Sequence, residues 1–240
     1  MKRGRDYIIF PLDVASLDDA KPLISELADY VGMFKVGLEL FIRSGPDIIH
    51  YIKSQCDTGI FLDLKLHDIP VTVKRAAASI ADLGVDLATV HCAESSAMLK
   101  AAADGSGQKV ALLGVTILTS VSEADLVSAG YSETHCSSTT LVVKRALMAK
   151  SAGMAGVVCS GQEVDRIKTA CGDAFLCVTP GIRPAWQVIK QDDQKRICTP
   201  AQAVEMGSDY LVIGRPIRDA ADSAAAAQRI AEEIEEALKN

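Results

Sequence analysis

The feature that most constrains the fold is a repeated alternation of short apolar runs with segments of helical periodicity. Eight apolar runs of strand length lie at residues 7–14, 32–40, 59–66, 86–92, 109–118, 156–159, 174–179 and 210–214. Between and after them, helices are predicted at residues 16–27, 44–53, 94–103, 138–152, 162–170, 200–206 and 218–238, with another starting at Pro70. A long polar loop is predicted at residues 119–137.

Eight strand–helix units imply a parallel sheet with right-handed crossover connections. At 240 residues, with no change in composition that would mark a linker, they predict an α/β fold: one (β/α)8 TIM barrel over residues 1–240. The competing arrangement is a doubly wound open sheet. The first predicted strand is not followed by the G-x-G-x-x-G pattern of its dinucleotide-binding form.

Composition narrows the classes of partner. Hydrophobic residues make up 49% of the chain, and the net charge is −6 without a Lys/Arg block, so no nucleic-acid or membrane partner is predicted. Seven scattered cysteines without a C-x-x-C pair favour reduced, mostly buried thiols in a cytoplasmic protein. No signal peptide is recognisable, and no apolar run approaches the roughly 20 residues of a membrane span.

The third run ends in the charged stretch Asp63-Leu64-Lys65-Leu66-His67-Asp68. Side chains alternate along a strand, so Asp63 and Lys65 are predicted to point to the same side. Pro70 suits the first turn of a helix, which puts these charges in a strand-to-helix turn. They form either a structural ion pair that closes the strand end or part of a functional site.

A barrel gives such polar residues a common location, because active sites of this fold lie at the carboxyl ends of the strands. The polar residues at predicted strand ends are Asp13, Lys35, Asp63, Lys65, Thr119, Arg183 and Arg215. Gly214 allows close approach of the backbone after the eighth strand, and Arg215 can donate two parallel hydrogen bonds to phosphate oxygens. The alternative for Arg215 is an ordinary surface arginine.

Several motifs together resemble those of the orotidine 5'-phosphate decarboxylase family, bacterial type. The first is Asp63-x-Lys65-x-x-Asp68 followed by Ile69-Pro70-x-Thr72. The others are Leu12-Asp13, Phe34-Lys35-Val36-Gly37, Leu118-Thr119-Ser120, Thr179-Pro180-Gly181-Ile182-Arg183, Asp193-Gln194-x-Arg196, Thr199-Pro200 and Ile213-Gly214-Arg215-Pro216-Ile217. They occur in the family's order and span nearly the whole chain.

The resemblance implies cofactor-free decarboxylation of orotidine 5'-monophosphate to uridine 5'-monophosphate in de novo pyrimidine biosynthesis. Lys35, Asp63, Lys65 and Asp68 are similar to the family's catalytic charged array, in which Lys65 would protonate C6. The substrate-binding residues it implies are Asp13, Lys35, Ile69, Thr72, Thr119, Ser120, Pro180, Arg183, Gln194, Gly214 and Arg215. A homodimer is implied, with Asp68, Ile69 and Thr72 acting across its interface, and so is a phosphate-covering lid at residues 183–195.

Some alternatives stay open. Thr119, Ser120 or Ser122 could contact the pyrimidine, although a hydroxyl after a strand is often only a turn or cap. His67 and the pair His91-Cys92 are interpreted as structural rather than as ligands. A 3-keto-L-gulonate 6-phosphate decarboxylase resembles this barrel but would use Mg²⁺. It would have an acidic metal ligand at the position that Lys35 occupies in this sequence. A phosphosugar epimerase would need further metal ligands, and a non-catalytic nucleotide-binding barrel need not keep the charged array.

Overall fold

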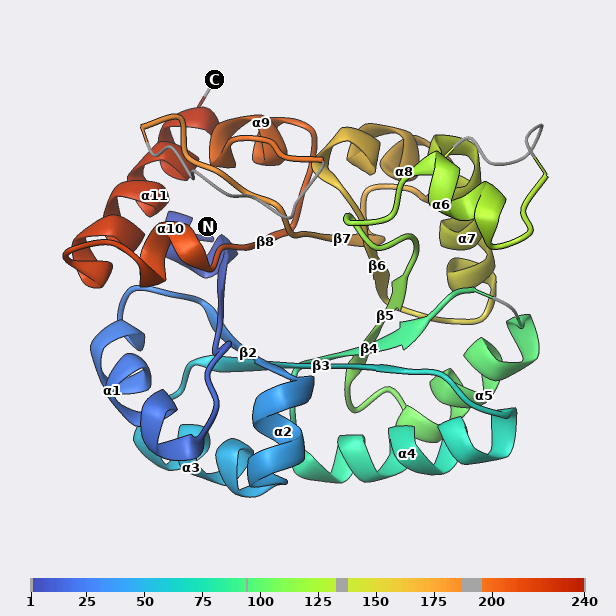
Figure 1. Ribbon diagram of the computed structural model, residues 1–240, viewed down its shortest axis with the longest axis horizontal. Helices are drawn as coiled ribbons and strands as arrows, with labels where there is room; N and C mark the ends of the chain where they lie inside the picture. Colours follow the sequence, from blue (N-terminus) through green and yellow to red (C-terminus); the bar gives the residue numbers. More distant parts are fainter. Residues whose placement is uncertain (1, 94, 133–137, 187–195, 240) are drawn as a thin grey trace.

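The computed structural model describes residues 2–93, 95–132, 138–186 and 196–239. Its eight strands form one closed parallel barrel in chain order, with the last strand paired to the first (Figure 1). The strands are β1 (Ile8–Pro11), β2 (Met33–Gly37), β3 (Gly59–Leu66), β4 (Leu87–His91), β5 (Ala111–Val115), β6 (Gly156–Val158), β7 (Leu176–Thr179) and β8 (Tyr210–Val212). The predicted (β/α)8 barrel is confirmed, and the open sheet is excluded.

Helices surround the barrel in Figure 1. They are α1 (Leu17–Leu27), α2 (Leu38–Ser44), α3 (Asp47–Gln55), α4 (Pro70–Leu83), α5 (Ser96–Ser106), α6 (Glu123–Ser128), α7 (Ser138–Ser151), α8 (Val164–Cys171), α9 (Pro200–Glu205), α10 (Arg215–Arg218) and α11 (Ser223–Ala237). Two 3-10 turns, η1 (Gly4–Tyr7) and η2 (Gly161–Glu163), complete the set. Within the described ranges, none of these helices is long and apolar enough to cross a membrane.

Alternation along the strands separates two apolar layers. Ile9, Phe61, Leu87, Leu113 and Val178 fill the inside of the barrel, and a larger core lies between the strands and the helices. Along β2, Phe34 and Val36 are buried in the outer layer, while Met33 packs on the inner one. Residues two positions after an inward residue face inward as well, so Lys35 and Asp63 continue the inner faces of β2 and β3 beyond Met33 and Phe61.

Several predicted boundaries were wrong because local capping overrode apolar periodicity. The apolar run 32–40 holds only a five-residue strand, since Leu38 already begins α2 after Gly37. The predicted helix 218–238 starts too early: α10 ends at Arg218, and α11 begins only at Ser223, after the Asp222 side chain that accepts a hydrogen bond from the Ala225 N–H. The predicted polar loop 119–137 contains α6.

The cysteine prediction is confirmed for the described residues. Cys92, Cys159, Cys171, Cys177 and Cys198 are free and buried, and Cys56 is free and partly buried. Burial raises the pKa of Cys198 to about 11 and that of Cys92 to about 12, so these thiols are protonated at neutral pH. Cys136 lies outside the described residues.

Candidate active site

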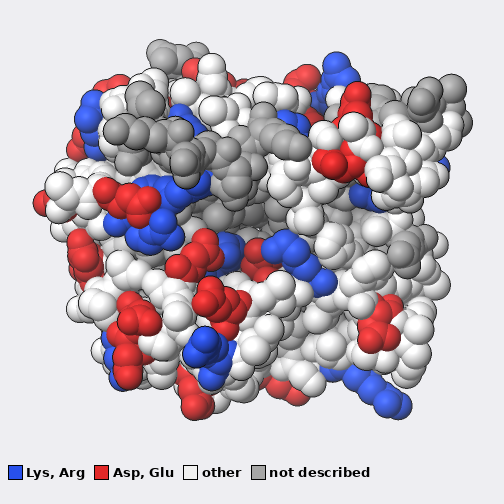
Figure 2. Space-filling model, viewed as in Figure 1, with Lys and Arg blue, Asp and Glu red and all other residues white. Residues whose placement is uncertain are grey.

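Four side chains, one from just after β1 and three from β2 and β3, form a row of alternating charge at the carboxyl end of the barrel. Lys35 Nζ lies 3.1 Å from Asp13 Oδ1 and 3.9 Å from Asp63 Oδ2, and Lys65 Nζ lies 2.7 Å from the same Asp63 oxygen. The Lys35 and Asp63 side chains are only 12% and 13% exposed, so their attraction is poorly screened by water. Figure 2 shows acidic and basic side chains alternating across the middle of this face.

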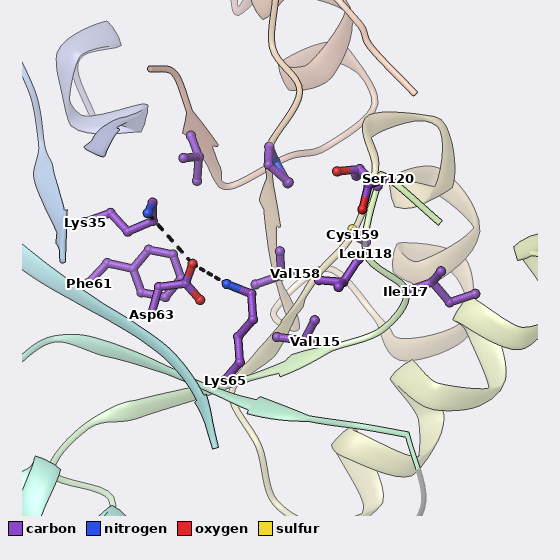
Figure 3. A pocket seen from close by; sticks show the side chains of 13 residues that line it. Lys35, Phe61, Asp63, Lys65, Val115, Ile117, Leu118, Ser120, Val158 and Cys159 are labelled. Carbon is purple, nitrogen blue, oxygen red and sulfur yellow. Dashed lines mark hydrogen bonds and ion pairs between the residues drawn. The ribbon is translucent and has the colours of Figure 1, made fainter. Parts of the chain in front are cut away.

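The row follows from the strand pattern, as the sequence predicted for Asp63 and Lys65. Figure 3 shows both side chains meeting in the pocket with Lys35 beyond Asp63. The backbone is less regular than predicted, because Lys65 has a φ of +51° and the pairing of β3 with β4 shifts between Leu62 and Leu66. A lysine with positive φ is uncommon, and such strain persists only where surrounding contacts hold it.

Lys35, Asp63 and Lys65 of this row form one wall of a cavity of about 220 Å³. Facing it are mostly apolar groups from β5, β6, β7 and β8: Val115, Ile117, Leu118, Val158, Cys159, Pro180 and Val212, with Phe61 at the base (Figure 3). The cavity therefore places two ammonium groups and one carboxylate against an apolar surface. A flat ring with a charged substituent fits this division chemically.

The structure separates the three candidate hydroxyls. Thr119 and Ser120 line the cavity, and Thr119 is buried. The Ser122 hydroxyl caps α6, accepting a hydrogen bond from the Asp125 N–H and donating one to the Asp125 carboxylate at 2.5 Å. Ser122 is therefore committed to a helix end, while Thr119 and Ser120 remain within reach of a bound molecule.

The predicted phosphate-binding residues lie after β7 and β8. Gly214 precedes α10, and a Cβ there would come within 2.9 Å of Pro11 Cγ, so the position is packed closely against β1. Arg215 opens α10 and is partly buried. The Arg183 N–H donates to the Cys198 carbonyl at 2.9 Å, and the Arg183 guanidinium donates to the Ile182 carbonyl. Gln194 and most of the predicted lid lie outside the described residues.

Asp68 does not join the row of charges within one chain. It is exposed and accepts a hydrogen bond from the Ile69 N–H at 2.6 Å, and within the described residues it makes no ion pair with Lys65. Ile69 is 62% exposed, and Thr72 is exposed on the first turn of α4. These three residues are therefore exposed to solvent, and none of them lines the cavity of their own barrel.

The two histidines of this end form a pair. The rings of His67 and His91 lie 5.5 Å apart, and burial lowers the pKa of His91, with the charges of His67 and Lys65 acting in the same direction. In the described part of the chain, no group of three His, Cys, Asp or Glu side chains could hold a metal ion.

Sequence reasoning missed several residues around the cavity. Thr89 of β4 contacts both Asp63 and Lys65, and its signal was a hydroxyl between the apolar residues Ala88 and Val90 of a predicted strand. Glu163 and Arg196 form a nearly buried ion pair, and Arg196 also donates to the Ile117 and Leu118 carbonyls at 3.4 and 3.3 Å. Burial raises the pKa of Glu163, and the charge of Arg196 opposes that rise.

The described end of the predicted lid is anchored to the barrel. Trp186 packs against the outer core, and the Arg229 guanidinium of α11 lies 4.4 Å from the centre of its ring. A cation over an aromatic face is a favourable contact, which gives this apolar residue a packing role. Val188 and Ile189, the other apolar residues of the predicted lid, lie outside the described residues.

Comparisons with known proteins agree with this geometry. The model of the orotidine 5'-phosphate decarboxylase / HUMPS family matches residues 6–230. The orotidine 5'-phosphate decarboxylase of Desulfosudis oleivorans is 52% identical, covering 98% of this chain and 95% of the relative, and that of Syntrophomonas wolfei is 44% identical, covering 98% and 100%. The crystal structure of the Lactobacillus acidophilus orotidine 5'-phosphate decarboxylase superposes with a TM-score of 0.81 at 38% identity, covering 95% of this chain and 98% of that one. The chain therefore belongs to the orotidine 5'-phosphate decarboxylase / HUMPS family.

Proposed function

We propose that this protein decarboxylates orotidine 5'-monophosphate to uridine 5'-monophosphate without a metal or organic cofactor. The observation that carries the proposal is the row of charges Lys35–Asp63–Lys65 along one wall of a largely apolar cavity, with Asp13 paired to Lys35 behind it. The family match and the names of the relatives support the same reaction.

The reaction breaks the bond between C6 and the carboxylate and leaves the electron pair on C6, which the ring cannot readily delocalise. Fixed positive charge next to C6 lowers the energy of that carbanion, most effectively where water is excluded. Lys65 is the group that stabilises the charge and then donates a proton to C6 as general acid. Asp63 lies against the departing carboxylate, and CO2 leaves toward the apolar wall.

Lys35 has two functions in this proposal. It sits between the carboxylates of Asp13 and Asp63, so it keeps two like charges apart and holds the row together. Asp13 and Lys35 bind the ribose hydroxyls, Thr119 and Ser120 bind the pyrimidine, and Arg215, with the Gly214 backbone, binds the 5'-phosphate. Pro180 and Arg183 complete the substrate site from the β7 side, and Gln194 is also assigned to it.

The active form is a homodimer in which Asp68, Ile69 and Thr72 serve the partner's site. The exposure of Asp68 outside its own cavity supports this, because a carboxylate of the charged array would otherwise be unused. Exposed apolar side chains that follow the neighbouring strands β2 and β3 also support it: Leu38 and Ile42 on α2, Ile69 just before α4 and Val71 on α4, with Ile42 79% exposed. The dimer acts in the cytoplasm, with the whole chain forming one catalytic domain.

The test is the loss of orotidine 5'-monophosphate absorbance on mixing with pure protein, with uridine 5'-monophosphate identified as the product. Lys65→Ala removes the proposed acid and should abolish turnover. Lys100→Ala is the matched control, because Lys100 is an exposed lysine paired with Asp104 on α5, and it should keep full activity. If the wild-type protein leaves the nucleotide intact, the proposed function is wrong.

A further inference from the structure

The β3–β4 ladder is interrupted beside the Asp63–Lys65 ion pair. Leu62 pairs with Ala88 and Leu66 pairs with Val90, so three residues of β3, Asp63 to Lys65, stand opposite Thr89 alone. Regular backbone pairing therefore cannot satisfy all of their polar groups. The interruption coincides with the positive φ of Lys65.

The Thr89 side chain fills this interruption. Its hydroxyl donates to Asp63 Oδ1 at 2.9 Å and accepts from the Lys65 N–H at 2.8 Å, and the residue is 1% exposed. The direction of both bonds is fixed, because an ionised carboxylate only accepts and a backbone N–H only donates. One buried hydroxyl thus connects the carboxylate of Asp63 to the strained backbone of Lys65.

This contact leaves each Asp63 oxygen with its own partner. Oδ1 accepts from Thr89, and Oδ2 faces Lys65 Nζ at 2.7 Å and Lys35 Nζ at 3.9 Å. The carboxylate cannot rotate about its axis without losing one of these bonds. A bound substrate carboxylate would repel Asp63. The hydrogen bond from Thr89 to Oδ1 would hold the Asp63 side chain in place against that repulsion.

We propose that Thr89 is a positioning residue, which holds Asp63 and the Lys65 backbone in register for decarboxylation without touching the substrate. This inference rests on the proposed function. Thr89 is absent from the described residues that line the cavity, which agrees with an indirect role. The alternative is that Thr89 only satisfies buried polar groups and contributes to stability alone.

The variants Thr89→Val and Thr89→Ser separate these roles. Valine keeps the shape and removes the hydroxyl, so kcat should fall roughly 10- to 100-fold, as expected for loss of a hydrogen bond to a charged group. KM should change by less than about threefold, because the phosphate and ribose contacts are untouched. Serine restores the hydroxyl and should keep kcat within about threefold of the wild type.

Thr116→Val is the matched control. Thr116 is also 1% exposed at the same end of the barrel, and its hydroxyl donates to the Val158 carbonyl at 2.9 Å, away from the ion pair. It should lower the melting temperature about as much as Thr89→Val does and leave kcat nearly unchanged. Equal losses of kcat in the two valine variants, or a Thr89→Ser variant as slow as Thr89→Val, would show that Thr89 is only structural.

A second measurement does not depend on turnover. The Lys65 amide donates to Thr89, so its hydrogen exchange, followed by NMR, should accelerate in Thr89→Val and return toward the wild-type rate in Thr89→Ser. Unchanged exchange in Thr89→Val overturns the positioning role. If the wild-type protein fails to decarboxylate the nucleotide, the proposed function fails, and amide exchange alone still decides whether Thr89 holds the Lys65 backbone.

Discussion

A mixture of two inactive variants should recover activity if Asp68 serves the partner's site. Lys65→Ala removes the proposed proton donor, and Asp68→Ala removes a carboxylate that does not line its own cavity. Each homodimer should be nearly inactive. In a two-fold dimer that mixes the chains, one site collects both lesions and the other is intact.

The size of the recovery follows from the symmetry. Equal amounts of the two chains with free exchange give about half heterodimers, and each heterodimer has one intact site of two. The mixture should therefore reach about one quarter of the wild-type activity per subunit. The assay is the absorbance decrease of orotidine 5'-monophosphate, with subunit exchange followed by native mass spectrometry.

The control is a mixture of Lys65→Ala with Asp63→Ala. Asp63 and Lys65 form an ion pair within one chain, so every site of that heterodimer lacks one of them, and no activity should return. If exchange is complete and the Lys65→Ala and Asp68→Ala mixture stays inactive, Asp68 acts in its own subunit and the assignment across the interface is refuted.

Three further outcomes are expected. Arg215→Met should lower kcat/KM for the nucleotide roughly 100-fold or more and have little effect on a substrate without phosphate. Arg218→Met, on the same short helix, should leave kcat/KM nearly unchanged. Comparable losses of Arg215→Met on both substrates would contradict a phosphate contact. EDTA should leave the rate unchanged, and a loss restored by Mg²⁺ would favour the gulonate-phosphate reaction. Burial lowers the pKa of Lys2 from 10.5 to about 8, so between these pH values the unfolded chain binds more protons than the folded one. The free energy of unfolding of the wild type, measured relative to Lys2→Met, should therefore rise as the pH increases above about 8. A difference that does not change with pH would contradict this prediction.

Much of the fold could be predicted from local pattern. The run 59–66 and Pro70 gave β3 and the start of α4 at the residues observed, since apolar runs and a first-turn proline act through neighbours in the chain. Boundaries that depend on caps were missed: β2 ends at Gly37, and Asp222 starts the last helix at Ser223 rather than at Arg218.

The residues of the site were likewise only partly predictable from the sequence. Two-residue alternation was enough to put Asp63 and Lys65 on one face, and the barrel brings Asp13 and Lys35 to them because parallel strands end at one edge. Nothing in the local sequence distinguished Ser122, which caps α6, from Thr119, which lines the cavity. That difference depends on where the chain turns after β5.

The sequence by itself determined the barrel and the shared face of Asp63 and Lys65, because strand periodicity depends on neighbours along the chain. Only the tertiary structure decided that Thr89 stands opposite the interrupted stretch of β3, that Arg196 reaches Glu163, and that Asp68 is exposed outside its own cavity. Those contacts are between residues of different strands and loops, and they depend on the register of the strands and on the path of the crossover connections. A bulge shifts the register, and no sequence pattern predicts where it occurs.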